Sequence, residues 1–462
     1  MVMKNSQGVF RPVFFFMLVF SAVFSPAQQA GGGDTQALLT EVSQLMARRE
    51  YNAALELFDK IDGSVLQTSE VQLLRASILN SAGRTADARA IASRISSREP
   101  KNVDALLVLA GSAAAEGKDR DQRTVLEKVV QIDPKNLKAH SDLGYIALRA
   151  RSLRIAAGHF DRALAVDENY REALVGRAIV YRYSRDPKNS ELLLNRAIRQ
   201  NPDWAMPLNE RARLYKGAGF PEDALSDLDA AKKLEPDSYW ISVDRALTLL
   251  DLNRRREALE ELDHAIPLSP GDFLAYVYRA GLRDEFGDYA GAEQDYVILM
   301  KIKPDYYFAA EGLGIIKMRN KQYIEARDAF LAAYRQAPKE YRYALLAAIN
   351  WMKAGRQNDP KQFLAQVLKT APRDSADWYL LRLYHDLSGD SDVGARINEE
   401  QNLDAKTKMQ FYLANYYDIR GNKNIAINYF LQVRDMNRRS LIEWKINEMM
   451  LEERGVGMAG GN

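Results

Sequence analysis

Four histidines, His140, His159, His264 and His385, are the side chains of this sequence best suited to acid–base or metal chemistry, and they are widely scattered. None lies in a His-Glu-x-x-His motif, and the sequence has no serine elbow or phosphate-binding glycine loop. His140 and His159 are close enough in sequence to approach each other, but a metal site needs a third ligand. There is no cysteine, which excludes disulfides, thiol catalysis and cysteine-bound zinc. We therefore predict a protein without catalytic residues, metal or cofactor, whose histidines are ordinary core or surface residues.

The balance of charges argues against nucleic-acid binding as the main function. Lysine and arginine total 64 against 62 aspartates and glutamates, and residues 1–27 contain two of the cations and no acid. The remainder is therefore neutral, which argues against nucleic acid as the main partner because that binding depends on phosphate neutralisation. Adjacent acids such as Asp284 and Glu285 diverge on a helix, so we interpret them as parts of solvated faces.

The N-terminal segment predicts export. Two cations precede an apolar run from Val13 to Phe24, and small residues follow at Ser25 and Ala27. This pattern is typical of a cleaved secretory signal, so we assign residues 1–27 to a signal peptide and expect an exported, periplasmic protein. The alternative is an uncleaved membrane anchor, although the apolar run is shorter than the ~20 residues that span a bilayer. Residues 28–34 are a flexible lead-in rich in glutamine and glycine.

The rest of the chain is organised by a proline that recurs every 34 residues. Eight of the fifteen prolines share one phase, and Glu168 occupies the empty place. Such a period indicates a repeat architecture. The prolines are Pro100, Pro134, Pro202, Pro236, Pro270, Pro304, Pro338 and Pro372. Ten units follow in phase over residues 35–374, starting at 35, 69, 103, 137, 171, 205, 239, 273, 307 and 341.

Each unit reads as two antiparallel helices. The eighth position is alanine or glycine from Ala76 to Ala348, and the twentieth is alanine in most units, which allows two helices to approach closely. A large apolar residue such as Phe160 recurs four positions later, on the same helical face. Glycines at position 15 end the first helix, and the proline ends the second. We expect N-caps two residues after the proline, for example Asn102 and Asp374.

These residues resemble the tetratricopeptide repeat family, with small residues at positions 8 and 20, a large apolar residue at 24 and proline at 32. The resemblance implies an all-α fold, a right-handed α-solenoid of about twelve helix-turn-helix units. Residues 375–440 form two divergent units, residues 441–454 an amphipathic capping helix, and residues 455–462 a disordered tail. We expect the superhelix to bend or loosen at Glu168 and after Asp374.

The family frame also predicts which side chains face the concave groove. Positions 2, 5, 9, 12 and 13 give one basic and aromatic set and one apolar set. The basic and aromatic set is Tyr145, Arg149, Arg182, Tyr183, Arg213 and Lys216. The apolar set is Trp240, Val243, Leu247, Leu274, Val277, Phe308, Ile315 and Met318. A partner segment would anchor apolar groups on Trp240 and Phe308 and acidic groups on the arginines. The alternative is that these side chains pack between helices or carry ordinary surface charge.

Two functions remain open. The first is a non-catalytic scaffold of the cell envelope that binds another envelope protein or peptide in the groove, as the resemblance implies. The second is an accessory protein that holds a small ligand or glycan for a transporter or a polysaccharide export system. Position 5 of the repeats carries no lysine, so the carboxylate clamp of chaperone-binding family members is absent. The sequence does not predict the oligomeric state.

Overall fold

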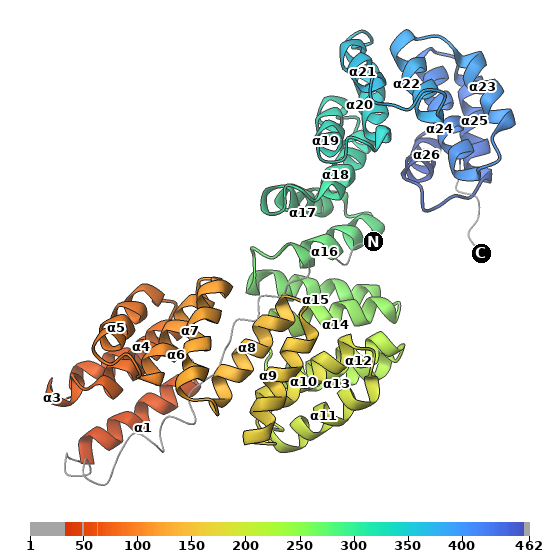
Figure 1. Ribbon diagram of the computed structural model, residues 1–462. Helices are drawn as coiled ribbons and strands as arrows, with labels where there is room; N and C mark the ends of the chain where they lie inside the picture. Colours follow the sequence, from red (N-terminus) through yellow and green to blue (C-terminus); the bar gives the residue numbers. More distant parts are fainter. Residues whose placement is uncertain (1–32, 49, 62, 457–462) are drawn as a thin grey trace. The chain divides into compact units, whose positions relative to one another are not determined.

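The computed structural model describes residues 33–456 apart from residues 49 and 62, and all regular elements in that range are helices. The chain divides into two compact units, one ending at Arg254 and one beginning at Arg255 (Figure 1). Within each, helices stack in consecutive pairs, so the expected all-α solenoid is confirmed. In the described range no helix is both long and apolar enough to cross a membrane. The predicted signal peptide and the end of the predicted tail lie outside these residues.

In the first unit six repeats contribute a first and a second helix, and a seventh contributes its first helix alone, because its second helix, α15 (Arg255–Leu268), belongs to the second unit. The first helices are α1 (Gly33–Ala47), α4 (Ser69–Ser81), α6 (Val103–Ala115), α8 (Leu137–Arg149), α10 (Arg171–Tyr183), α12 (Ala205–Ala218) and α14 (Tyr239–Asp251). The second helices are α2 (Tyr51–Glu56) with the 3₁₀ turn η1 (Leu57–Lys60), α5 (Thr85–Arg98), α7 (Asp119–Ile132), α9 (Leu153–Val166), α11 (Pro187–Gln200) and α13 (Pro221–Leu234). A single turn, α3 (Gly63–Leu66), precedes α4.

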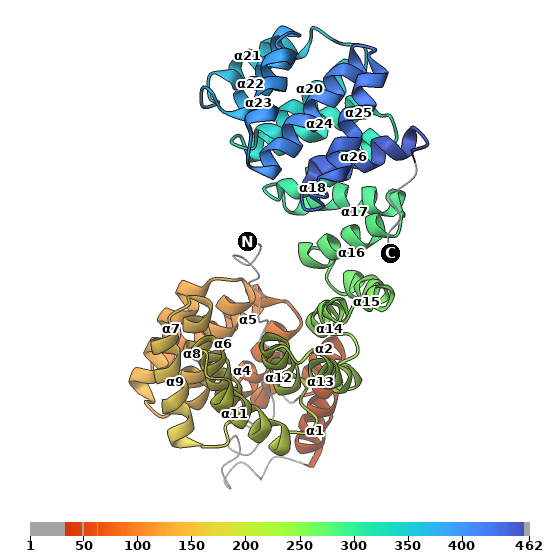
Figure 2. The same ribbon diagram turned by 90° about the vertical axis from the view of Figure 1, so that its right-hand side faces the viewer.

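The second unit begins with α15 (Arg255–Leu268) and ends with α26 (Ile442–Glu453). Its first helices are α16 (Phe273–Glu285), α18 (Tyr307–Arg319), α20 (Tyr341–Lys353), α22 (Ala376–Asp386) and α24 (Leu403–Ile419). Its further second helices are α17 (Tyr289–Ile302), α19 (Tyr323–Gln336), α21 (Pro360–Leu368), α23 (Asp390–Glu399) and α25 (Lys423–Asp435). Helix α26 packs against α24 and α25, where Ile446 and Leu451 are fully buried (Figure 2).

The turns between helices follow the repeat. From α4 to α20 each first helix begins at the residue where the sequence places the start of a unit. Position 15 is left-handed throughout this range, in glycines such as Gly83 (φ 79°) and also in Arg151 (φ 58°). A glycine is therefore not required for the first helix to end there, although a side chain makes that backbone conformation costlier.

One prediction about helix ends needs correction. Asn102 caps α6 by accepting from Ala105 N–H as expected, but the cap of α22 is Ser375 rather than Asp374. Asp374 has φ 64° and sits just before the cap, because α22 begins at Ala376, one residue later than the 34-residue frame places it. At Glu168 the turn is kept without the proline: the Tyr170 N–H bonds the Asp167 carbonyl at 3.1 Å, the same bond that other units make after their proline turn. The bend expected at Glu168 stays a prediction.

Large side chains at position 24 lie directly over the small residues at position 8. The ring of Phe160, which is fully buried, lies so close to Gly144 that a Cβ added there would be 2.6 Å from it. The same ring touches Gly176 on the next first helix. In the second unit Phe330 lies over Gly314 in the same way. The missing side chains therefore set how closely the helices pack.

Arginines at position 7 join neighbouring repeats, a feature that was not predicted. Three of them bond an aspartate sixteen residues earlier, in the second helix of the preceding repeat. The pairs are Arg177 with Asp161, Arg245 with Asp229 and Arg279 with Asp263, each at 2.7 Å. Arg279 also forms a two-pronged pair with Asp295 of its own repeat, at 2.6 and 2.9 Å. Such paired bonds from a planar guanidinium fix the geometry of both helices.

Candidate binding surfaces

The basic and aromatic set lies on α8, α10 and α12, and its cations are paired within the chain. Arg182 donates to Glu210 at 3.0 Å, and Arg213 reaches Glu210 at 2.5 Å and Asp244 at 2.7 Å. Glu210 is only 2% exposed. Burial alone would raise the pKa of Glu210, but the charges of Arg213 and Arg182 outweigh it and lower that pKa. The result is a carboxylate-centred network in place of a free positive surface.

The other two cations of this set also have partners. Arg149 donates to Asp119 at 2.8 Å, and Lys216 lies 3.5 Å from Asp251. Tyr145 donates its hydroxyl to a backbone carbonyl of α10, and burial raises its pKa well above the ordinary value. An acidic partner group would have to compete with these internal carboxylates. The structure therefore does not favour the predicted recognition of acids by Arg149, Arg182 and Arg213.

Tyr183 is the member of this set that stays most accessible. Its side chain is 40% exposed at the end of α10. The guanidinium carbons of Arg182 and Arg151 lie 4.6 and 4.9 Å from its ring centroid. These cation–π contacts hold the ring in place while leaving it open to solvent. A ring fixed in this way can be covered by a partner at little entropic cost.

The apolar set divides into buried and accessible members. Val243, Met318 and Ile315 are 1%, 2% and 8% exposed, so their side chains belong to the core and are not available to a partner. Trp240, Leu247, Leu274 and Val277 are half-buried. Phe308 is 39% exposed, which is unusual for a phenylalanine in the interior of a repeat array. The alternative interpretation, packing between helices, therefore holds for part of this set.

Three members of the apolar set meet in a pocket of the second unit. Val277, Phe308 and Ile315 line a cavity of about 340 Å³ together with the rings of Tyr296 and Tyr306. The ring of Phe308 lies 5.6 Å from that of Tyr306. The polar lining comprises Glu311, Arg342, Arg439, Ser440 and Lys445, and Gly312, Leu441 and Ile442 complete it. Its size lies at the small end of the range for ligand pockets, roughly 300–1,000 Å³.

The outer wall of this pocket is the chain's own C-terminal segment, residues 439–445. Lys445 donates to Asp284 of α16 at 2.5 Å, and further along α26 Glu452 lies 3.3 Å from Arg319 of α18. These contacts join residues 161 and 133 positions apart in the sequence. Helix α26 was predicted to cap the last repeat, and it does so, but it also closes the groove of much earlier repeats.

The charges in the pocket are unevenly matched. Glu311 accepts from the Tyr343 hydroxyl at 2.6 Å, which together with burial raises the pKa of Tyr343. Arg342 pairs with Glu340 at 2.7 Å, and Lys445 with Asp284. Arg439 is exposed and bonds only the amide oxygen of Asn437, with its guanidinium 5.6 Å from the Trp444 ring. Among the described residues Arg439 has no carboxylate partner and Glu311 has no cationic one, so the pocket carries one positive and one negative charge that are not paired in an ion pair.

Two segments of the chain, residues 73–136 and 141–204, match the model of the tetratricopeptide repeat family. The match supports assignment to the tetratricopeptide repeat family. No curated protein matches the sequence. The first matched segment begins in α4 and the second ends at the residue before α12, so both cover the helix pairs described above.

Solved structures agree with the tetratricopeptide fold. A chain in the crystal structure of the APC/C hetero-tetramer Cut9–Hcn1 is 14% identical with a TM-score of 0.51, and the alignment covers 68% of this chain and 63% of that one. This chain thus spans less than two thirds of that length. PilF of Pseudomonas aeruginosa (17% identity, TM-score 0.38) aligns over 45% of this chain and 94% of its own. PilW, a type IV pilus biogenesis factor (18%, 0.40), aligns over 46% and 98%.

Tetratricopeptide repeat proteins generally mediate interactions between proteins, and their repeats form scaffolds that are generally not catalytic. Within each unit the described repeats contact their neighbours in sequence, so they form a continuous surface. Within the described residues, no three histidines and acids come together to hold a metal ion.

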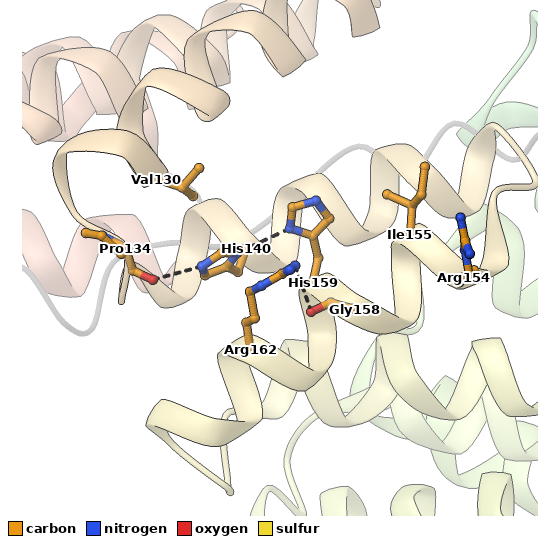
Figure 3. A pocket seen from close by; sticks show the side chains of 8 residues that line it. All are labelled: Val130, Pro134, His140, Arg154, Ile155, Gly158, His159 and Arg162. Carbon is orange, nitrogen blue, oxygen red and sulfur yellow. Dashed lines mark hydrogen bonds between the residues drawn. The ribbon is translucent and has the colours of Figure 1, made fainter.

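The predicted approach of His140 and His159 is confirmed. Their Nδ1 atoms lie 3.2 Å apart, and His140 Nε2 lies 3.0 Å from the carbonyl of Pro134 (Figure 3). His140 is 4% exposed, whereas His159 faces a shallow cavity of about 660 Å³. Burial first, then the neighbouring charges, lowers the pKa of His159 to about 4.

The residues that sequence reasoning missed lie outside the groove positions of the tetratricopeptide frame. Tyr306 occupies the last place of its repeat, Arg439 lies near the end of the last repeat, and Lys445 lies beyond it. Because the repeat pattern numbers each repeat separately, it does not predict that the C-terminal segment contacts α16 and α18. The sequence feature that could have pointed to this segment is its group of three cations, Arg438, Arg439 and Lys445.

Proposed function

We propose that this protein is a non-catalytic scaffold that binds a segment of a partner protein in the pocket of its second unit. The observation that carries the proposal is the exposed Phe308 ring in a cavity walled by the C-terminal segment, next to the unmatched Arg439. An exposed aromatic in a concave pocket, beside a fixed polar group, is typical of an interaction hot spot.

The lining defines the chemistry of the partner segment. Val277, Tyr306 and Phe308 offer an apolar and aromatic wall for one large side chain. Arg439, which is exposed, bonds the Asn437 amide oxygen through Nε and has no carboxylate partner among the described residues, so its guanidinium can pair with a carboxylate of the partner. A cavity of about 340 Å³ has room for one or two side chains and not for a whole helix. The best-fitting segment is therefore an acidic residue beside a large apolar residue, in an extended or turn conformation.

This proposal narrows the hypothesis made from the sequence. Phe308 stays an anchor, and the acidic group of the partner moves from the internally paired Arg149, Arg182 and Arg213 to Arg439. Binding by the remaining accessible residues of both sets, Tyr183 and Trp240 among them, stays a prediction.

A photocrosslinking experiment tests the pocket. Phe308 is replaced by the photoreactive residue p-benzoylphenylalanine, and irradiation of cells should give an adduct with one partner protein. Arg439→Ala removes a charge-assisted hydrogen bond of about 1.5–3 kcal/mol, so the adduct should fall about tenfold or more. The measurement is the yield of the adduct on an immunoblot, with its identity from mass spectrometry.

Phe286 supplies the matched control position. It is 43% exposed at the end of α16 and does not line the pocket, so the same photoreactive residue there should give no such adduct. Equal adducts from positions 286 and 308, or an adduct that Arg439→Ala leaves unchanged, would contradict the proposal. The alternative function, an accessory protein for a small ligand or glycan, is supported by the aromatic lining of the same pocket. It predicts that an adduct with a small molecule replaces the protein adduct.

We also propose that the protein is exported to the periplasm and that its partner is another envelope component. The support is the signal-like pattern of residues 1–27. If the signal is cleaved after Ala27, the mature protein should begin at Gln28 and be released with the periplasmic fraction. N-terminal sequencing of the purified native protein measures this. An intact N-terminus in the membrane fraction would instead support the anchor.

A further inference from the structure

The cavity beside His159 differs from the pocket of the second unit in its charge. Its lining comes from the end of α7, the turn after it, α8 and α9 (Figure 3). The residues are Val130, Pro134, His140, Arg154, Ile155, Gly158, His159 and Arg162. Two arginines and two histidines are present, and no acid is among them. A concave surface of this composition attracts an anion.

For a pair of neutral rings, the hydrogen bonds determine which nitrogen of each ring carries the proton. A carbonyl only accepts, so His140 must donate from Nε2 to Pro134, which leaves a lone pair on Nδ1 of the neutral ring. That lone pair accepts from Nδ1–H of His159 at 3.2 Å. His159 therefore keeps its own lone pair on Nε2, on the side of the ring away from His140 (Figure 3). Because His140 is buried, its ring holds this pattern of hydrogen bonds in place.

The arginines flank a gap on α9. Arg154, Gly158 and Arg162 are four residues apart, so they lie on one face of the helix, with the two arginines about 12 Å apart along its axis. Gly158 has no side chain, and the Arg162 guanidinium lies over it, with one nitrogen 3.6 Å from where a Cβ would be. Arg162 bonds only the Gly158 carbonyl at 3.2 Å, and both arginines are exposed. Within the described part of the chain neither has a carboxylate partner.

We propose that this pocket binds a phosphate group, either on a phosphomonoester or as free phosphate. Arg154 and Arg162 donate hydrogen bonds to the phosphate oxygens, and His159 Nε2 accepts a hydrogen bond from the phosphate O–H. A monoprotonated phosphate has both the charge for the two guanidiniums and an O–H that can donate to the Nε2 lone pair. Sulfate has the charge and shape but no proton to donate. Ile155, 49% exposed, and Val130 flank the site and can contact the organic part of an ester.

The pH dependence follows from the proton. The groups that act on His159 are His140 on α8, Arg162 on α9, and Arg123 and Glu127 on α7, and only Glu127 favours its protonation. The empty site is therefore neutral at His159 above pH ~4. A phosphomonoester loses its second proton near pH ~6, so above that pH the complex must take up a proton. The affinity for a phosphomonoester should be independent of pH below about pH 6, and it should fall up to tenfold for each pH unit above that value.

The four histidines of the chain make the site observable by nuclear magnetic resonance of the ring nitrogens. Phenyl phosphate should shift the His159 and His140 signals saturably and leave those of His264 and His385 in place. Phenyl sulfate should bind at least about tenfold more weakly, because it leaves the Nε2 lone pair without a donor. Binding of inorganic phosphate as tight as phenyl phosphate would identify free phosphate as the ligand, and weaker binding an ester.

Two variants test the residues separately. Arg162→Ala should weaken phenyl phosphate binding about tenfold or more, whereas Arg120→Ala, at an exposed position of α7 outside the pocket, should not change it. Gly158→Leu fills the gap without altering a charge and should also abolish binding. Circular dichroism confirms that each variant is folded. Equal shifts with phosphate and sulfate, no saturable shift, or undiminished binding in Arg162→Ala would overturn the proposal.

Discussion

Replacing Asp295 with alanine is expected to lower the free energy of unfolding of the second unit by about 3–5 kcal/mol. Asp295 is 1% exposed and accepts from Arg279 at 2.6 and 2.9 Å and from Arg283 at 3.0 Å. The side chains of Arg279 and Arg283 are 13% and 19% exposed. Without Asp295 the two guanidiniums would lose their buried partner and keep only the more exposed Asp263 and Asp288. Removing the buried member of such a pair is strongly destabilising, because charges that are largely shielded from water lose part of their compensation.

The matched control for this change is Asp263. It also pairs with Arg279, at 2.7 Å, but is 48% exposed, so Asp263→Ala should cost less than about 1 kcal/mol. Hydrogen exchange of the full chain is the suitable measurement because it localises the loss to α16, α17 and α18 even where unfolding is not two-state. Similar losses for both variants would show that burial of the carboxylate is not the cause.

Replacing Phe160 with alanine is expected to cost the first unit about 3–5 kcal/mol. The ring is fully buried in the core between α8, α9 and α10, and it rests against Gly144 and Gly176. Its removal leaves a cavity that Gly144 and Gly176 cannot fill, because these two residues lack side chains. Hydrogen exchange over residues 137–183 should show the loss.

A double-mutant cycle gives this prediction a sharper form. Gly176→Ala alone should destabilise by about 1–3 kcal/mol, because its Cβ would overlap the Phe160 ring. In the Phe160→Ala background the same change should be close to neutral, since the ring is gone. Gly217→Ala is the control, because a Cβ there meets nothing within 4 Å and should stabilise α12 by about 0.5–1 kcal/mol. Additive effects of the two changes would disprove the close contact.

The fold was predictable because its determinants are local and repeated. The proline phase located the starts of nine first helices, and the small residues at position 8 faced the large residues at position 24 as expected. The failure at Asp374 arose where this repetition ends. There the cap moved to Ser375, because α22 begins one residue later than the 34-residue period places it.

The candidate site was predictable only in part, because its electrostatics depend on partners in other repeats. Arg182 and Arg213 appeared free in a list of groove positions, yet Glu210 lies between them. Phe308 was found because its position faces the groove. Arg439 was not, because nothing local in the sequence tells that residues 439–445 return to α16 and α18. Contacts over more than a hundred positions have no periodic signature.

The return of residues 439–445 to the groove means that the two sides of the pocket come from segments more than a hundred positions apart in the sequence. In a variant without this segment, α16 and α18 would still carry Val277, Tyr306 and Phe308, but these side chains would form an open surface without the opposite wall. The pocket therefore depends on the folding of the second unit from α16 through to α26.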